Sequence, residues 1–134
     1  MANNLANYAE NKVLELLVGK TAFTTPTAYV ALFTAAPSDT GGGTEVSGGS
    51  YARKSTAGAD WAAASGGSIQ NANDIVFTTA SADWGTVTHV ALIDSSTSGG
   101  SNNYLWWGPL TASKVVNNGD IFKFLAGTLV MTLD

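Results

Sequence analysis

The apolar positions of residues 3–18 recur with the three- and four-residue spacing of an amphipathic helix. They are Leu5, Tyr8 or Ala9, Val13, Leu14, Leu16 and Leu17. Gly19 is expected to end this helix because glycine accepts the left-handed conformation that commonly closes one, and Lys20 places positive charge near the negative end of the dipole. So wide an apolar stripe predicts a helix that covers a sheet or meets a neighbouring subunit, since exposing it forgoes about 25 cal/mol per Å².

From residue 21 onward the pattern changes to short β-prone runs separated by Gly, Ser, Asn and Pro. The first strong strand is predicted at 28–34, and its nearly continuous apolar character indicates burial on both faces, with the helix as one candidate cover. Residues 36–43 are predicted to form a flexible surface loop. The pattern further predicts a brief strand pairing at 45–46 and a strand at 51–56, and it leaves helix and strand both open at 59–64. A turn at 65–68 is followed by a short strand that begins at Ile69 and by a strand at 75–78.

Two hairpins are predicted in the C-terminal half. In the first, residues 86–94 pair with residues 104–107 across a long polar connection. In the second, which carries the stronger signal, residues 110–116 and 121–124 flank the turn sequence Asn117-Asn118-Gly119-Asp120. These elements predict a mainly β fold: an antiparallel β-sandwich or barrel-like domain with one N-terminal α-helix.

The 134 residues fit a single domain, with the helix at 3–18 and a β-rich body at 21–134. Charged residues make up 12% of the chain, about half of the roughly 25% typical of globular domains. So few charges leave little repulsion between copies. The composition therefore favours a protein that buries much of its surface against partners.

Charge and composition exclude several classes of partner. The net charge is −4, and the adjacent basic pair Arg53-Lys54 is too little to neutralise phosphates, so nucleic-acid binding is not expected. The absence of cysteine excludes disulfides and thiolate metal sites. No apolar run reaches the roughly 18–20 residues of a membrane span, and Met1-Ala2-Asn3-Asn4 lacks the basic start of a secretory signal. The protein is expected to be made in soluble form, with no membrane partner.

The sequence offers no catalytic, cofactor or metal site. His89 is the single histidine, and its place within a predicted strand favours a half-buried ring over a catalytic base or a zinc ligand. Five aspartates lie next to predicted turns or strand ends, where carboxylates commonly accept backbone amides: Asp60, Asp74, Asp83, Asp94 and Asp120. A glycosidase pair among them stays open, because the sequence does not give the separation of two carboxylates. We predict no enzyme activity.

Four tryptophans, Trp61, Trp84, Trp106 and Trp107, are many for so short a chain. Neighbours along a regular strand point to opposite faces, so Trp106 and Trp107 are not expected to enter the same side of a core. One of them is predicted to meet the helix, another sheet or another subunit. Core packing or a subunit interface is favoured over a carbohydrate-binding platform.

An ordered set of segments across nearly the whole chain resembles a family of small tailed-bacteriophage virion proteins, known as tail-fibre-like or head-decoration proteins. These segments are 8–19, 28–34, 44–53, 84–94, 118–120 and 122–133. The resemblance implies a small β-rich virion component and provides no catalytic motif. The doubled Trp106-Trp107 and the run Ala62-Ala63-Ala64 depart from the family pattern.

Two positions in the virion compete under this resemblance. The favoured one is a capsid decoration, or cement, protein that stabilises the head through subunit contacts, because 134 residues without repeats or heptads are too short to form a long fibre alone. The alternatives are a tail-fibre or baseplate component contacting the host surface, and a lectin-like carbohydrate-binding module. The expected partners are other copies in a homo-oligomer, with a trimer as one option, and the major capsid protein. Assembly into the virion is expected in the host cytoplasm, and the predicted interface residues are Leu14, Leu17, Trp106 and Trp107.

Overall fold

A computed structural model describes residues 4–98 and 102–133. Its largest element is a six-stranded antiparallel sheet in which β8 (Tyr104–Val116) and β7 (Gly85–Ile93) pair along most of their length. β2 (Ala28–Ala35) lies on the other side of β7. The remaining strands of this sheet are β1 (Asn4–Leu5) beside β8, and β3 (Thr44–Glu45) and β4 (Lys54–Thr56), which both pair with β2.

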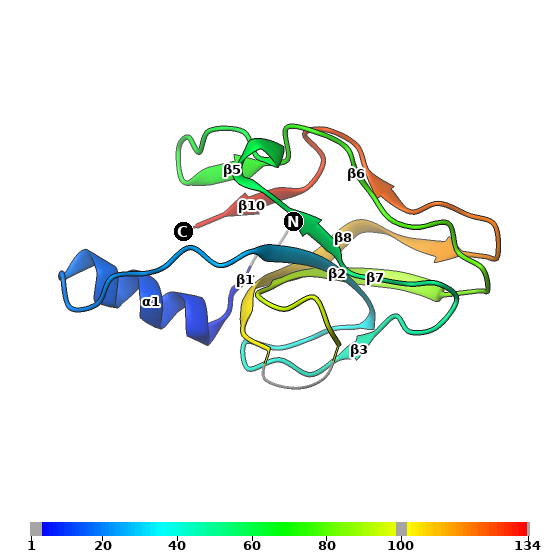
Figure 1. The fold of residues 1–134 in the computed structure, drawn as a ribbon, viewed down its shortest axis with the longest axis horizontal. Coiled ribbons are helices and arrows are strands. Elements are labelled where there is room, and N and C mark those ends of the chain that lie inside the picture. Colours follow the sequence, from blue (N-terminus) through cyan, green and yellow to red (C-terminus); the bar gives the residue numbers. More distant parts are fainter. Residues whose placement is uncertain (1–3, 99–101, 134) are drawn as a thin grey trace.

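Two small antiparallel pairs form a second layer above the large sheet (Figure 1). β5 (Ser68–Gln70) pairs with β10 (Val130–Thr132), and β6 (Ile75–Val76) pairs with β9 (Lys123–Phe124). A short 3₁₀ helix, η1 (Gly58–Asp60), precedes β5. The described strands do not close into a barrel, so the sandwich form of the predicted fold class is confirmed.

The main core lies between these two layers. β2 and β7 contribute alternate aliphatic side chains, and the upper layer contributes an aromatic group in which the rings of Phe77 and Phe122 are 5.8 Å apart and those of Phe122 and Phe124 are 5.1 Å apart. Edge-to-face ring packing of this kind is favourable beyond the area it buries. The fully buried aliphatic residues of this core are Val30, Leu32, Val87, Val90 and Leu129.

The opposite face of the large sheet is also buried, as the apolar run of β2 predicts. Ala31, Phe33, Ala91 and Ile93 form a second core with Tyr104 and Trp107 packed against it. The segment 36–43 supplies part of its cover: Trp107 Nε1 donates to Asp39 Oδ1 at 2.9 Å, and the Tyr104 hydroxyl donates to the Gly42 carbonyl at 3.3 Å. The predicted flexible loop is therefore a folded turn. This turn, and not the N-terminal helix, covers this face of β2.

Glycine is required in this turn. Gly43 has φ +74°, and a Cβ there would lie 2.7 Å from the Pro37 backbone nitrogen. Ser38 and Gly41 close the turn with reciprocal backbone hydrogen bonds of 2.9 Å. The tight chain reversal that covers the second core thus depends on a residue without a side chain.

The helix is shorter than predicted. α1 spans Asn7–Leu17 rather than residues 3–18, because Asn4 and Leu5 pair with Trp107 and Trp106 of β8 instead of winding into a first turn; residue 3 lies outside the described residues. The predicted end is confirmed. Gly19 has φ +68°, and the Lys20 amide donates to the Glu15 carbonyl at 2.9 Å, which is a left-handed helix cap.

The second predicted hairpin is wrong, although its turn is present. The Asp120 amide donates to the Asn117 carbonyl at 2.9 Å, but the strand before this turn pairs with β7 and the strand after it pairs with β6. Residues 117–120 therefore carry the chain from one layer to the other. The first hairpin is confirmed, and its second strand runs on to Val116 because residues 104–107 and 110–116 form one long strand, β8.

Trp84 and Trp106 provide a matched test of core packing. Both are buried, but Trp84 Nε1 donates to the Gly49 carbonyl at 2.9 Å, whereas Trp106 Nε1 has no hydrogen-bond partner among the described residues. W84F and W106F remove similar apolar area, and only W84F also removes a hydrogen bond. We expect W84F to lower the free energy of unfolding by about 1 kcal/mol more than W106F. Urea unfolding followed by circular dichroism measures the difference; equal losses would contradict it.

Candidate functional site

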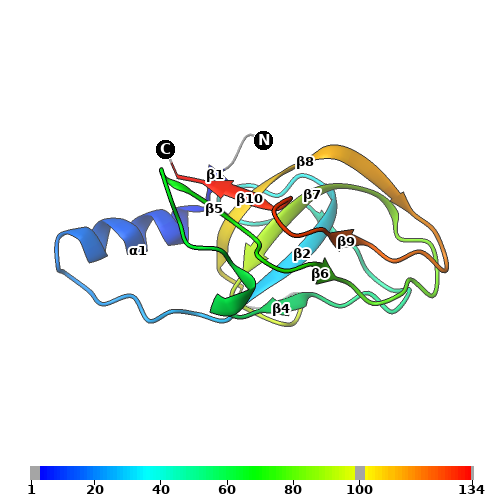
Figure 2. The ribbon, with the colours of Figure 1, turned by 90° about the horizontal axis from the view of Figure 1, so that it is seen from above.

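The far end of α1 projects from the β-rich body (Figure 2). This end and its C-cap residue expose four aliphatic side chains, which we call the apolar arm. Their exposed fractions are 62% for Leu14, 51% for Leu16, 76% for Leu17 and 78% for Val18. Only Ala9 of the helix is buried. The base of the helix is held by the body, since the Asn7 amide donates to the Asp39 carbonyl and the Ala6 amide to the Leu105 carbonyl, each at 3.1 Å.

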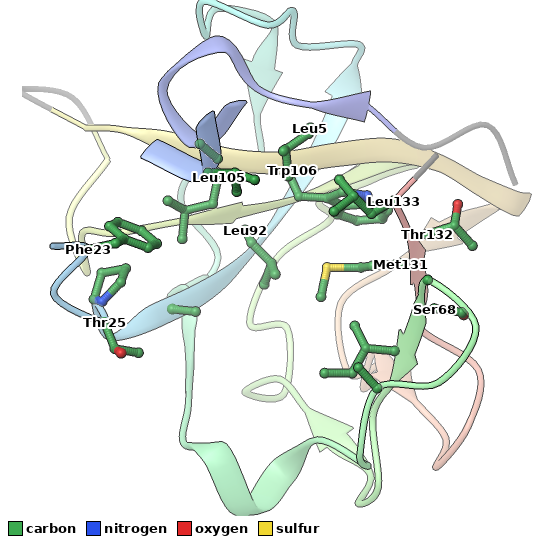
Figure 3. Close-up of a pocket in the computed structure, with 17 residues that line it drawn as sticks. Leu5, Phe23, Thr25, Ser68, Leu92, Leu105, Trp106, Met131, Thr132 and Leu133 are labelled. Carbon is green, nitrogen blue, oxygen red and sulfur yellow. The ribbon is translucent and has the colours of Figure 1, made fainter. Parts of the chain in front are cut away.

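A groove of about 470 Å³ opens beside the helix, and we call it the apolar groove (Figure 3). Its lining contains no charged residue. Val13 and Phe23 line it from the helix side, while Trp106, Met131 and Leu133 line it from β8 and from the β10 region. Because Val13 lies three and four residues before Leu16 and Leu17 on the helix, the groove and the apolar arm form one continuous apolar surface.

The four predicted interface residues lie in different environments. Leu14 and Leu17 belong to the apolar arm and are exposed. Trp107 is half-buried on the second face of the large sheet, where its ring centroid lies 6.3 Å from that of His89. Trp106 is 2% exposed and packs in the main core, so the expectation that the two rings point to opposite faces is confirmed. Contact of these residues with a partner stays a prediction.

A buried ion pair joins β3 to the residue that precedes β4, within the large sheet. Arg53 Nε and Nη2 donate to the two carboxylate oxygens of Glu45, each at 2.8 Å, and the two side chains are 2% and 9% exposed. Arg53 Nη1 donates to the Ser95 carbonyl at 2.8 Å and to Asn102 Oδ1 at 3.1 Å. Bidentate pairing of this kind combines geometric specificity with strength.

Tyr51 extends this network to β2. β3 and β4 pair with different parts of β2, and between them the Leu32 amide donates to the Tyr51 hydroxyl at 2.9 Å. That hydroxyl in turn donates to Glu45 Oε1 at 3.0 Å. Burial and the charge of Glu45 raise the pKa of Tyr51 far above its usual range. Burial also acts to raise the pKa of Glu45, but the hydrogen bond and charge of Arg53 outweigh it, and the pKa lies below its usual value.

A polar cavity of about 490 Å³ lies beside this ion pair, lined in part by Phe33, Tyr104 and Asn102. A carbohydrate site needs polar groups free to meet hydroxyls and an aromatic surface to stack on. Here each guanidinium nitrogen of Arg53 already donates within the fold, and Tyr104 donates to Gly42. The charged residues of the cavity therefore hold the fold together.

The candidate catalytic residues, His89 and the turn aspartates, make structural contacts in the fold. Thr88 Oγ1 lies 2.8 Å from His89 Nδ1, burial lowers the pKa of His89, and the ring has no hydrogen bond to a carboxylate among residues 4–98 and 102–133. Each of the five turn aspartates accepts a backbone amide at 2.8 or 2.9 Å, which confirms their predicted structural role: Asp60, Asp74, Asp83, Asp94 and Asp120. Within the same ranges, no cluster of three His, Cys, Asp or Glu residues could bind a metal.

No helix in the described part of the chain combines the length and the apolar character that crossing a bilayer requires. α1, with 11 residues, is well below the roughly 20 that a span needs.

Comparison with known families gives one match. The model of the family described as podophage GP4 fiber I protein gp80 matches residues 4–132, which is nearly the whole chain. No curated protein matches the chain. The match covers the apolar arm, both layers of the fold and every residue of the apolar groove except Leu133.

Because the Arg53 pair is buried and the Lys12 pair is exposed, we expect R53M to lower the free energy of unfolding much more than K12M does. R53M leaves the Glu45 carboxylate buried without its partner and should lower the free energy of unfolding by about 3 kcal/mol. K12M removes the exposed pair between Lys12 and Glu15 on α1, 3.5 Å long, and should change it by less than about 0.5 kcal/mol. Urea unfolding at pH 7 tests both. Similar small losses would show that the Arg53 pair does not stabilise the fold.

The same pair predicts a pH dependence of stability. The pKa of Glu45 is lowered in the folded state, so its contribution is complete above the unfolded value near 4.5 and is lost as pH falls through the folded pKa. We expect E45Q to be less stable than the wild type at pH 7 and the gap between them to narrow from about pH 5 downward. Urea midpoints measured across this range provide the test. A gap that stays constant would contradict the lowered pKa.

Proposed function

The chain belongs to the podophage GP4 fiber I protein gp80 family, and from this membership we propose that it is a fibre component of the virion. Membership makes it a phage virion protein of a structural, non-enzymatic family. The finer position, in a fibre, is supported by the family's own description. We propose further that the protein performs no turnover, in keeping with aspartates that are engaged in turns and a histidine without an acid partner.

The geometry supports a role in assembly. The apolar arm and the apolar groove together form a surface that water solvates poorly, on a chain with 12% charged residues. Exposed apolar patches of this kind mark protein contacts. The proposed mechanism is burial of this surface between subunits in a homo-oligomer, for which a trimer is one option, during virion assembly in the host cytoplasm.

Capsid decoration is the second candidate function. It is favoured by the shape of the protein, a short β-rich body without repeats, which by itself spans little of the length of a fibre. In that position the projecting arm would dock between major capsid subunits and tie them together. The same surface would serve both functions, so the distinction lies in the number of copies and their place on the particle.

Copy number per virion distinguishes the two positions. A fibre component follows the low symmetry of the tail and should be present in tens of copies, whereas a decoration protein covers the shell and should approach hundreds; these are order-of-magnitude expectations from closed symmetry. Quantitative gel densitometry of purified particles, calibrated against the major capsid protein, gives the number. Antibody-gold labelling then gives the position. We expect tens of copies with label at the tail; hundreds of copies with label over the head would overturn the fibre proposal in favour of decoration.

A further inference from the structure

We propose that the apolar arm of one copy docks in the apolar groove of a second copy, and that the exchange is reciprocal. This inference rests on the proposed structural role in the virion and names the contact that would join the subunits. Three observations support it: none of the described residues fills the groove, the arm matches the apolar chemistry of the groove, and the buried area suffices only if the contact is made in both directions.

The groove has the chemistry of an interface that lacks its other half. Its walls carry aliphatic, aromatic and small polar side chains and no charged group. Figure 3 shows Leu92 of β7 and Met131 of β10 pointing toward the same space. An occupant must therefore be apolar and uncharged, which rules out a nucleic acid or an acidic peptide.

The apolar arm is the feature of this chain that meets those requirements. Leu17 and Val18 lie three and four residues after Leu14 and so share a face with it, and each of the three is more than 60% exposed. Lys12 and Glu15 are paired with each other, and Glu10 lies one turn before Leu14, toward the base of the helix. Each copy thus provides both a projecting apolar surface and an apolar recess.

The arm is held away from its own groove. The base of α1 is fixed by β1, which pairs with β8, and by the Asn7 to Asp39 hydrogen bond, while its end is closed by the cap at Gly19. Val13 already forms part of the groove wall. For the arm to turn into its own groove, these contacts would have to break, so the contact forms between copies.

The available area decides the form of the assembly. Fully burying one aliphatic side chain removes on the order of 100 Å² from water, so the arm offers on the order of 250 Å² and a single arm–groove contact buries about 500 Å² in total. Stable interfaces bury at least about 1,000 Å². One contact is therefore too small, whereas two copies that exchange arms bury about 1,000 Å² in total.

Disulfide trapping tests the contact directly, because the chain has no cysteine of its own. L17C places a thiol on the arm, and A64C places one at an exposed position of the groove. Each variant carries one thiol, so any disulfide joins two chains. The matched control is A59C, an exposed alanine in η1 that does not line the groove. Circular dichroism checks that all three variants fold as the wild type does.

We expect an equimolar mixture of L17C and A64C, oxidised at micromolar concentration, to form a mixed dimer at least ten times more abundantly than a mixture of L17C and A59C. Equal yields, or no product, would overturn the proposal.

Sedimentation provides a second readout: L17D should weaken self-association at least tenfold, and I121D, at an exposed apolar residue away from the arm, should leave it unchanged. A wild type that is monomeric throughout would assign the groove to another virion protein and refute arm exchange. Since copy number and gold labelling do not depend on this contact, the fibre proposal can stand when arm exchange fails.

Discussion

The fold depends on the burial of β2 and β7 on both faces of the large sheet. Their side chains alternate between two cores, so the chain must cover the sheet twice. The upper layer of short strand pairs covers one face, and the turn at 36–43, with Tyr104 and Trp107, covers the other. The amphipathic helix contacts the sheet at β8 instead. Its apolar side is exposed because the β-rich body already satisfies itself, and a helix in that position stabilises the protein only through another surface.

The features that could be predicted from the sequence are those set by residues close together along the chain. The uninterrupted apolar run of β2 reports burial on two faces, the alternation of neighbouring strand residues separates Trp106 from Trp107, and Gly19 ends the helix through a conformation that other residues adopt at a cost. Aspartates at chain reversals likewise follow from the short reach of their side chains to nearby amides. Each of these outcomes depends on residues within a few positions of one another.

The remaining features depend on partners distant in the sequence. The sequence of the turn at 117–120 is compatible with a next strand that pairs with β8 and with one that crosses to the other layer. The crossing depends on pairing with β6, about fifty residues earlier in the chain. The helix starts late because β8 captures Asn4 and Leu5. The ion pair of Glu45 and Arg53 was missed as well. Its residues look like ordinary surface charges, and only the approach of β3 and β4 to the same strand brings them together and buries them.

The strand order also governs when the chain can become a folded protein. β2 pairs with β7, β1 pairs with β8 and β5 pairs with β10, so each of these strands is synthesised well before its partner. Contacts this far apart in sequence form slowly, and the two-faced apolar strand stays without its neighbour until most of the chain has left the ribosome. A chain cut off before residue 104 lacks the partner of both β1 and β7. Early termination therefore leaves the large sheet incompletely paired.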